Sequence, residues 1–346
     1  MKIAVLAPAW FPVPPTGYGG IESVVSLLAD GLVDAGHDVT LFASGDSRTR
    51  AELEAVFRIA PSERIGRSFW ELPHVLHCYE RADEFDVIND HSGPLAAALA
   101  AAVDTPVVHT AHGPLDGEAG RLYDQVSRFA PNLGLISLSM NQRKPRPNLN
   151  WIANSPNALD LSVYPFRPQR GEYLLFLGRM SPEKGAHRAV AVAMEAELPL
   201  KIAGKKREPK EQEYWEQFVE PHLGDGIEWL GEVPHGKKVE LLERARATLF
   251  PIDWEEPFGL VMIESMACGT PVIATRHGAV PEVVEHGRSG IIVDDYRLIP
   301  EALDEADRLD PRELRRYVEQ RFSPLRMVRD YVRAYQVAVE EAATRA

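Results

Sequence analysis

Short apolar runs alternate with polar, glycine-bearing loops along the whole chain. Residues 2–7 are apolar at every position after the lysine, which is typical of a parallel strand covered on both faces. After a loop rich in proline and glycine, apolar residues at 21, 24, 25, 28 and 32 lie on one face of a predicted helix. Further strands are predicted at 39–43, 86–88, 106–109 and 133–137. This alternation predicts an α/β domain with a parallel sheet.

The same alternation restarts in the second half. Residues 154–170 contain three prolines and little periodicity, so we interpret them as a linker between two α/β domains. In such domains ligands bind at the carboxyl ends of parallel strands, and clefts between domains favour small molecules. Residues 323–346 predict a polar amphipathic helix whose place in the fold is not revealed by periodicity. A helix is predicted at 186–196, and strands at 173–177, 200–203, 227–230, 247–250, 271–274 and 291–293.

Composition excludes several classes of protein. The 346 residues suffice for two domains of about 150 residues each. A balance of 38 Lys+Arg against 51 Asp+Glu gives a net charge of −13, which argues against a duplex nucleic-acid binder. No apolar stretch approaches the roughly 20 residues of a membrane-spanning helix. Because Cys78 and Cys268 form neither a disulfide framework nor a metal-ligand pattern, we expect a reduced, cytoplasmic protein.

The strongest candidate for chemistry is the segment that begins at Glu256. A Pro-Phe-Gly turn follows, and then a short predicted helix over 260–268 with Gly269 as its cap. The unpaired N–H groups at the start of such a helix bind anions. Glu264 lies about one turn further on, so both carboxylates can accept hydrogen bonds from sugar hydroxyls. Two isolated acids near a helix start would instead serve the helix dipole; the whole segment favours a ligand site.

A second motif, at 178–185, connects a predicted strand to a predicted helix. Arg179 and Lys184 both lie in this loop, and two cations at the edge of a sheet suit a diphosphate. The alternative is a solvated loop in which Glu183 neutralises one of them.

Two weaker motifs lie in the first half. Gly19 and Gly20 open the first helix and allow a ligand close to the backbone, although their spacing is not that of a dinucleotide fingerprint. His109 and His112 lie at the end of an apolar strand. A histidine there either faces a ligand or is a structural residue whose hydrogen bonds are satisfied within the protein. His91 also ends a strand, and either an acceptor-side or a structural role fits it.

These motifs occur together and in one order, and the combination resembles the retaining glycosyltransferases of family GT4, which have the GT-B fold. The resemblance spans roughly residues 1–340, and it is specific as a combination. It is carried by G-G-x-E at 19–22, G-R…K-G at 178–185, E-x7-E at 256–264 and V-P-E-V-V-E-H-G at 280–287.

The resemblance implies an α/β fold of two Rossmann-like, parallel-sheet domains facing across a cleft. Residues 1–160 and 323–346 would form the acceptor-side domain, with the last helix crossing back onto it. Residues 161–322 would form the domain that binds the nucleotide sugar.

It also implies roles for the donor-binding residues. Arg179 and Lys184 would hold the donor diphosphate. Glu256 would contact the hydroxyls of the transferred sugar, and Glu264 the nucleotide ribose. Backbone amides of the turn would lie near the sugar and phosphates, at Phe258, Gly259, Leu260 and Val261.

In the first domain, Gly19 and Gly20 would close over the phosphates. His112 would lie beside the transferred sugar and the reaction centre. Together with Glu256, Arg179 and Lys184, it makes up the implied catalytic set.

The implied reaction moves a hexose from a nucleotide-diphosphate sugar, of the UDP-glucose or GDP-mannose type, to an acceptor hydroxyl. The resemblance implies front-face, substrate-assisted transfer, in which the leaving β-phosphate helps to deprotonate the acceptor. Double displacement through Glu256 is the alternative mechanism. No Asp-x-Asp occurs in the chain, so we expect neither a metal nor another cofactor.

Other functions and partners remain open at this stage. A GT-B sugar-nucleotide epimerase and a non-catalytic sugar-nucleotide-binding protein share the fold, and turnover that requires an acceptor separates them from a transferase. We expect no nucleic-acid partner and at most a transient membrane contact, through Arg143, Lys144 and Arg146. The sequence does not identify the acceptor: a lipid, a glycan and a small metabolite all fit.

One departure from the family pattern follows the predicted strand at 200–203. Many relatives have a second glycine nearby, whereas this chain has Lys205, Lys206 and Arg207. These cations either contact substrate or form a solvated patch with Glu208, Glu211 and Glu213.

Overall fold

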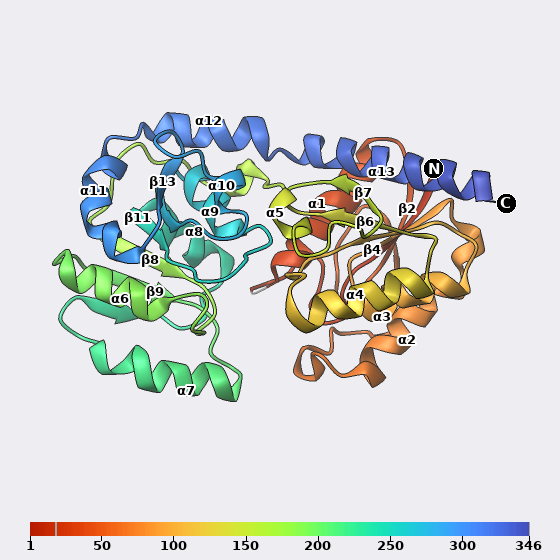
Figure 1. The fold of residues 1–346 in the computed structure, drawn as a ribbon, viewed down its shortest axis with the longest axis horizontal. Helices are drawn as coiled ribbons and strands as arrows, with labels where there is room; N and C mark the ends of the chain where they lie inside the picture. Colours follow the sequence, from red (N-terminus) through yellow and green to blue (C-terminus); the bar gives the residue numbers. More distant parts are fainter. Residues whose placement is uncertain (18, 346) are drawn as a thin grey trace. The chain divides into compact units, whose positions relative to one another are not determined.

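A computed structural model describes residues 1–17 and 19–345, which form two α/β units (Figure 1). One unit comprises Met1–Ala158 together with Pro324–Ala346, and the other comprises Leu159–Ser323. Ala346, which ends the last predicted helix, lies outside the described residues. None of the helices in the described ranges has both the length and the apolar character needed to cross a bilayer.

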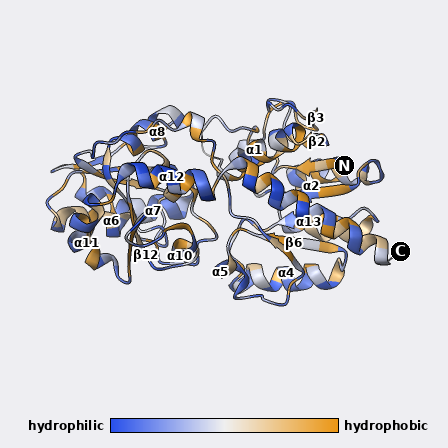
Figure 2. Ribbon diagram, turned by 90° about the horizontal axis from the view of Figure 1, so that it is seen from above, coloured by the Kyte–Doolittle hydropathy of each residue, from blue (hydrophilic) through white to orange (hydrophobic). Residues whose placement is uncertain are grey.

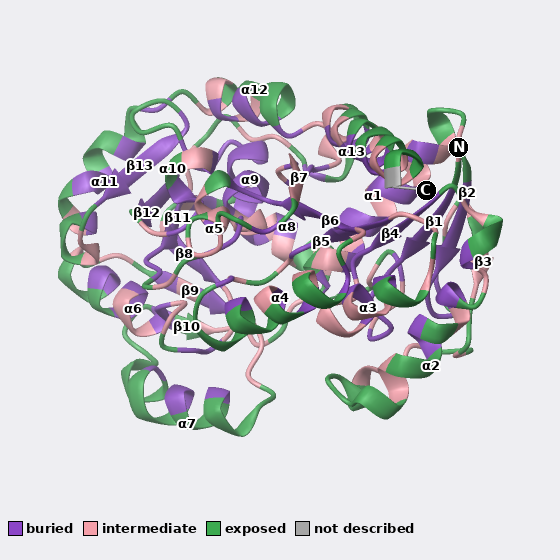
Figure 3. Cartoon of the chain, turned by 45° about the vertical axis from the view of Figure 1, so that its right-hand side comes forward, coloured by how far each residue is buried: buried purple, intermediate pink, exposed green. Residues whose placement is uncertain are grey.

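The first unit is built on a seven-stranded sheet in which all neighbours are parallel, in the order β3-β2-β1-β4-β5-β6-β7. The predicted parallel sheet is therefore confirmed. Its central strands are buried along nearly their whole length, shown for β1 and β4 in Figure 3. The strands are β1 Lys2–Leu6, β2 Asp38–Phe42, β3 Glu52–Glu54, β4 Val87–Asp90, β5 Val107–Thr110, β6 Leu133–Ser137 and β7 Trp151–Asn154.

Amphipathic helices cover this sheet, and orange and blue residues alternate along α4 and α13 in Figure 2. The apolar face of α1 is buried as the periodicity predicts, at Val24, Val25, Leu28 and Leu32. The helices are α1 Gly20–Asp34, α2 Ser68–Tyr79, α3 Pro94–Leu99, α4 Gly117–Phe129, α5 Met140–Arg143 and α13 Pro324–Arg345.

The C-terminal helix α13 belongs to the first unit, so the expected return of this helix is confirmed. It packs on α1 where Gly31 leaves room, because a Cβ at that glycine would lie 2.6 Å from Cγ2 of Val328. Tyr331 and Tyr335 of α13 are fully buried against the sheet. Glycine on one helix and a branched side chain on the other thus bring the two helices together.

The second unit has a six-stranded parallel sheet, in the order β10-β9-β8-β11-β12-β13. Its strands are β8 Tyr173–Leu177, β9 Leu200–Ala203, β10 Ile227–Trp229, β11 Ala245–Phe250, β12 Val272–Thr275 and β13 Gly290–Val293. Its helices are α6 Ala186–Glu195, α7 Pro209–Phe218, α8 His235–Glu243, α9 Leu260–Ala267, α10 Val280–Val283, α11 Ile299–Asp307 and α12 Pro311–Arg321.

Residues 154–170 are more ordered than the linker that their prolines predict. β7 ends at Asn154, Leu161–Val163 form a turn of 3-10 helix, and Tyr164 is buried. The prolines interrupt regular periodicity without preventing burial: Leu159 is also buried, and the Tyr164 ring lies 5.4 Å from that of His235 in the second unit.

In both sheets the chain order reverses next to the first strand. The reversal lies between β1 and β4 in the first sheet and between β8 and β11 in the second. Loops that leave adjacent carboxyl ends at such a switch point diverge and leave space for a ligand. Gly19 and Gly20 come after β1, and the motif loops with Lys184 and Glu256 follow β8 and β11. The motifs therefore lie where the topology provides binding sites.

Candidate functional site

Two loops meet at the switch point of the second sheet, one after β8 and one after β11. The backbone N–H of Asp253 donates to the carbonyl of Glu183 at 2.8 Å, and the Arg188 guanidinium donates to the carbonyl of Pro251 at 2.7 Å. Gly185 makes this contact possible: its φ is +83°, and a Cβ there would lie 2.4 Å from the Pro251 oxygen. The two loops are thereby fixed to each other before any ligand binds.

Lys184 and Glu256 form the centre of this site. The Lys184 ammonium is ion-paired with Oε2 of Glu256, which also accepts a hydrogen bond of 3.1 Å from Nε1 of Trp254. The same ammonium lies 4.4 Å from the centre of the Trp254 ring. Glu256 is only 8% exposed. A half-buried ammonium in contact with a buried carboxylate can exchange this partner for the phosphate oxygens of a ligand, and the carboxylate can accept hydrogen bonds from hydroxyl groups instead.

The backbone of Glu256 is held by the segment before α10. Gly278, with φ +55°, lies so close that a Cβ would be 2.2 Å from the Glu256 nitrogen. The N–H of Ala279 donates to the Glu256 carbonyl at 2.8 Å. The motif at 280–287 thus begins directly after Gly278 and Ala279, the two residues that hold the Glu256 loop.

Helix α9 begins beside this loop, at a glycine in the left-handed region. Gly259 has φ +84°, and a Cβ there would lie 2.7 Å from Cε of Met262. The Phe258 side chain is buried and packs on Phe322. Phe258 can therefore contact a ligand only through its backbone. α9 ends at Ala267, with Gly269 beyond it at φ +88°. The predicted turn, helix and glycine cap are therefore confirmed.

Glu264 is 6% exposed and is held from two other elements. Its Oε1 accepts hydrogen bonds from the Tyr164 hydroxyl at 2.8 Å and from Nζ of Lys238 at 2.6 Å. Neither partner is part of a sequence motif: Tyr164 comes from the segment read as a linker, and Lys238 from α8. Two donors on one oxygen fix the orientation of the carboxylate.

Replacing Tyr164 with phenylalanine tests this contact. We expect a loss of about 1.5–3 kcal/mol in the free energy of unfolding, because the hydroxyl bonds to a carboxylate in a buried place. Urea unfolding of the variant measures it. Tyr173→Phe is the matched control, since that hydroxyl bonds at 2.8 Å to the neutral carbonyl of Leu241 and should cost about 1 kcal/mol. Equal losses in the two variants would contradict a special role for the carboxylate.

Arg179 lies in the same loop as Lys184 but is more exposed. Its guanidinium is 3.4 Å from Oε1 of Glu183, the partner that the solvated-loop alternative proposes for one of the two cations. Lys184 instead pairs with Glu256. The two cations therefore differ: the Lys184 side chain is 17% exposed and paired with Glu256, whereas the Arg179 side chain is 32% exposed and paired with Glu183 at the rim.

The basic segment after β9 has partners within the protein. Lys205 lies 3.0 Å from Glu208, and Nζ of Lys206 is 4.6 Å from the centre of the Trp215 ring. Lys205 also lies 3.9 Å from Glu211, and Arg207 pairs at 2.8 Å with Glu232, which is outside the three glutamates expected for the patch. These contacts favour the interpretation as a patch.

In the first unit, the loop after β1 ends at Gly19, the N-cap of α1. Gly19 has φ +152°, and a Cβ would lie 2.6 Å from Cβ of Pro15. Glu22, in the first turn of α1, is buried. Burial raises the pKa of Glu22 from its ordinary value of 4.5 to about 7, although its own backbone N–H lowers it somewhat.

This raised pKa predicts a dependence of stability on pH. The protonated carboxyl is favoured in the folded protein, so its contribution is complete below about pH 4.5 and is lost as the pH rises through about 7. The loss amounts to about 3 kcal/mol. The Glu22→Gln side chain stays neutral at every pH. By urea unfolding, we expect this variant to have a larger free energy of unfolding than the unchanged protein at pH 8. At pH 4.5 the two free energies should be similar. The same pH dependence in both proteins would contradict the assignment.

His112 and His91 meet at the carboxyl edge of the first sheet, after β5 and β4. Nδ1 of His91 is 2.8 Å from Nε2 of His112, and the Asn89 amide nitrogen is 2.8 Å from Nε2 of His91. Burial, and then the charge of His109, lower the pKa of His112 to about 3. Burial and the neighbouring histidines hold the pKa of His91 well below its usual range. Both rings are therefore neutral at pH 7.

His109 points into the core instead. Its Nδ1 is 2.5 Å from Oδ2 of Asp90 and its Nε2 is 2.7 Å from the Tyr123 hydroxyl. Both ring nitrogens are satisfied within the protein, which fits the structural interpretation of His109 and leaves His112 as the histidine at the edge.

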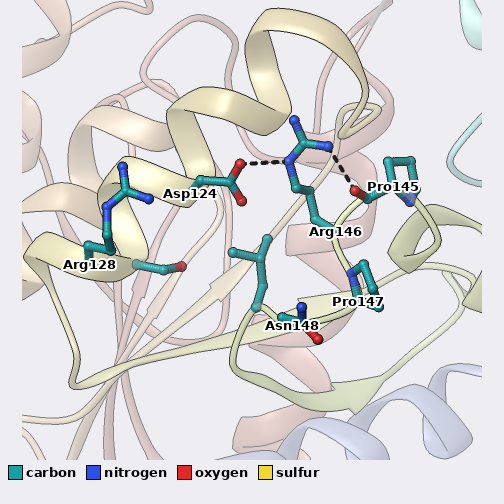
Figure 4. A pocket seen from close by; sticks show the side chains of 8 residues that line it. Asp124, Arg128, Pro145, Arg146, Pro147 and Asn148 are labelled. Atoms are coloured by element: carbon teal, nitrogen blue, oxygen red, sulfur yellow. Dashed lines mark hydrogen bonds and ion pairs between the residues drawn. The ribbon is translucent and has the colours of Figure 1, made fainter.

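The basic face at 143–146 is also bound into the fold. Arg146 donates to Oδ2 of Asp124 at 2.8 Å and to its neighbour's carbonyl at 2.7 Å, beside a pocket of about 400 Å³ (Figure 4). Arg143 lies 5.2 Å from the centre of the Trp151 ring, and Lys144 donates to Asn141 at 2.7 Å.

Comparison with known families identifies both units. The family "Glycosyltransferase Family 4" matches residues 18–155, and "Glycosyl transferases group 1" matches residues 165–320. The chain belongs to glycosyltransferase family 4. The resemblance seen in the motifs is thus confirmed, and so is the assignment as a glycosyltransferase enzyme.

Individual relatives cover most of this family 4 glycosyltransferase. It is 29% identical to a glycogen synthase of Mycobacterium tuberculosis, over 83% of this chain and 81% of that protein. It is 26% identical to a D-inositol 3-phosphate glycosyltransferase of Pseudarthrobacter chlorophenolicus, over 85% and 84%. The crystal structure of AviGT4, a glycosyltransferase of avilamycin A biosynthesis, superposes with a TM-score of 0.71 at 25% identity, over 99% and 98% of the two chains. The expected GT-B fold is confirmed.

Within each unit of the glycosyltransferase, the structure brings the predicted residues to one edge of the sheet. Lys184, Glu256 and the start of α9 converge in the second unit. Gly19, Gly20 and His112 follow strands β1 and β5 of the first. Sequence reasoning missed Tyr164 and Lys238, the two residues that orient Glu264.

Proposed function

We propose that this glycosyltransferase is a retaining, metal-independent enzyme that moves a hexose from a nucleotide-diphosphate sugar to an acceptor hydroxyl. The donor is of the UDP-glucose or GDP-mannose type. The observation that carries the proposal is the ion pair between the half-buried Lys184 and the buried Glu256, beside the start of α9. It places one cation, one carboxylate and a helix N-terminus where a sugar diphosphate needs all three.

Donor binding exchanges the partners within this site. The diphosphate takes the Lys184 ammonium, and Arg179 at the rim leaves Glu183 for the phosphate oxygens. Glu256 then accepts hydrogen bonds from sugar hydroxyls in place of Lys184. Both cations exchange a carboxylate for phosphate oxygens, the buried Glu256 keeps hydrogen-bond donors from the sugar, and the partly exposed Glu183 is left to water.

Glu264 serves the nucleoside end in this proposal. Its Oε1 is occupied by Tyr164 and Lys238. A ribose has neighbouring hydroxyls that can donate to a carboxylate oriented in this way. The unit Leu159–Ser323 is therefore the donor-binding unit, and the unit with His112 serves the acceptor side and the transferred sugar.

The reaction follows from these positions. The bond between the sugar C1 and the diphosphate oxygen breaks, and the acceptor oxygen bonds to C1 on the same face. The acceptor proton passes to an oxygen of the leaving β-phosphate. Lys184, Arg179 and the N–H groups at the start of α9 stabilise the negative charge that develops on the diphosphate.

The acceptor is not determined by the family. The names of the two relatives above point to a polymer, glycogen, in one case and to a small phosphorylated cyclitol in the other. We therefore leave the acceptor as a hydroxyl compound and define the enzyme by its donor.

The test is donor turnover in the presence of EDTA, with UDP-glucose or GDP-mannose and a pool of acceptor hydroxyl compounds. We expect release of nucleoside diphosphate that depends on the acceptor, and a product with the anomeric configuration of the donor by NMR. Release without any acceptor would indicate an epimerase or hydrolase. An inverted product, or turnover that EDTA abolishes, would contradict the proposed mechanism.

A further inference from the structure

The hydrogen bonds behind His112 determine which of its nitrogens carries the proton. We propose that Asn89 and His91 are positioning residues that hold His112 with its proton on Nδ1, so that His112 donates a hydrogen bond from Nδ1 to an oxygen of the transferred sugar. The choice of the sugar as recipient rests on the proposed function, whereas the position of the proton does not.

The chain of donors starts at Asn89, near the end of β4. Its amide nitrogen lies 2.8 Å from Nε2 of His91. With the amide in this orientation its NH2 donates, so Nε2 of His91 accepts. A neutral imidazole has a single N–H, and that of His91 is therefore on Nδ1.

The hydrogen bond between the two histidines then determines which nitrogen of His112 carries the proton. Nδ1–H of His91 points at Nε2 of His112 over 2.8 Å, so Nε2 of His112 accepts in turn. The proton of His112 is then on Nδ1. Burial of both rings keeps them neutral, which preserves the one-donor, one-acceptor pattern of each ring.

Helix α13 fixes His91 from behind. The Tyr331 ring is stacked on the His91 ring, with centres 5.8 Å apart and planes inclined by 23°. The Tyr331 hydroxyl lies 3.0 Å from the Thr110 hydroxyl of β5, and the backbone N–H of His91 donates to Leu6 at 2.9 Å. The ring of His91 therefore has no freedom to turn, and the C-terminal helix gains a role in the site.

A consequence concerns the acceptor proton. With Nε2 occupied by His91 and Nδ1 protonated, His112 has no lone pair to offer an acceptor hydroxyl. It is thus a neutral hydrogen-bond donor and not a general base. The proton must go elsewhere, which agrees with its transfer to the β-phosphate.

The first test is 15N NMR of the unchanged protein labelled at histidine, with the His112 signals assigned by their loss in His112→Gln. We expect a protonated, pyrrole-type shift at Nδ1 and an unprotonated, pyridine-type shift at Nε2. A proton on Nε2 would overturn the proposal, because it would mean that the Asn89 amide is reversed and the chain of donors runs the other way.

The second test separates positioning from stability. His91→Leu removes the link, and we expect kcat to fall about 10- to 100-fold, since His112 is no longer held. His91→Asn keeps an N–H near the place of Nδ1 and should recover most of the lost kcat. His74→Leu is the control, because His74 is a buried histidine of the same unit that bonds to the Ala7 carbonyl at 2.9 Å. That variant should lose stability and keep kcat. Equal kcat in His91→Leu and the unchanged protein would overturn the positioning role.

Discussion

Replacing Glu256 with alanine is expected to lower kcat for sugar transfer by at least about 10²-fold, in line with the loss of one preorganised group at a reaction centre. Affinity for the nucleoside diphosphate should stay the same or increase. The reason is the ion pair: Lys184 loses its carboxylate partner and is left with only the face of Trp254, so it binds a phosphate more readily. Steady-state kinetics and calorimetric titration with nucleoside diphosphate measure the two effects.

Glu255→Ala is the matched control, because Glu255 is the neighbouring carboxylate of the same loop and is exposed. Its kcat should be unchanged. If Glu256→Ala turned over like this control, the site would not be the reaction centre. If it instead lost nucleoside diphosphate affinity, Glu256 would support the loop and not contact the sugar.

Replacing Lys184 with alanine should act on binding. We expect the Kd for the nucleoside diphosphate to rise about 10- to 100-fold, as for the loss of a charged hydrogen bond to phosphate. The Kd for the nucleoside alone should not change, since the proposed function assigns Lys184 to the diphosphate and Glu264 to the ribose, and Glu264 keeps its bonds to Tyr164 and Lys238. The comparison of these two ligands by titration is the measurement.

Lys237→Ala is the control for this variant. Lys237 is exposed on α8, paired with Glu240 at 3.0 Å, and adjacent to the partner of Glu264. It should bind both ligands like the unchanged protein. Equal weakening of nucleoside and nucleoside diphosphate in Lys184→Ala would mean that the variant disturbs the whole loop.

The sequence predicted the buried strands well because burial on both faces leaves an unbroken apolar run. β6, β8 and β9 have the predicted bounds, and the other predicted strands lie within two residues of theirs. β3 and β7, the two edge strands of the first sheet, were missed: β3 is short with glutamate at both ends, and β7 has only four residues, none of them fully buried. The place of α13 could not be predicted, since an amphipathic pattern shows that a helix has a partner but does not identify it.

For the candidate site, the sequence predicted the loops and not the contacts. Lys184 and Glu256 are 72 positions apart, and only the parallel pairing of β8 with β11 makes their loops neighbours. The same holds for Arg207, whose side chain pairs with the distant Glu232, a residue that the expected patch did not include. Tyr164, Lys238 and the contact of His91 with His112 gave no local signal, because each depends on packing between separate elements.

The most direct test of the central claim is thermal unfolding with EDTA present and UDP, GDP, ADP or NAD near millimolar concentration. A ligand that binds the folded protein raises its unfolding temperature by mass action. We predict an increase with one of the nucleoside diphosphates, which would also identify the base of the donor. No increase with any diphosphate, or an increase with NAD alone, would contradict a metal-free site for a nucleotide-diphosphate sugar.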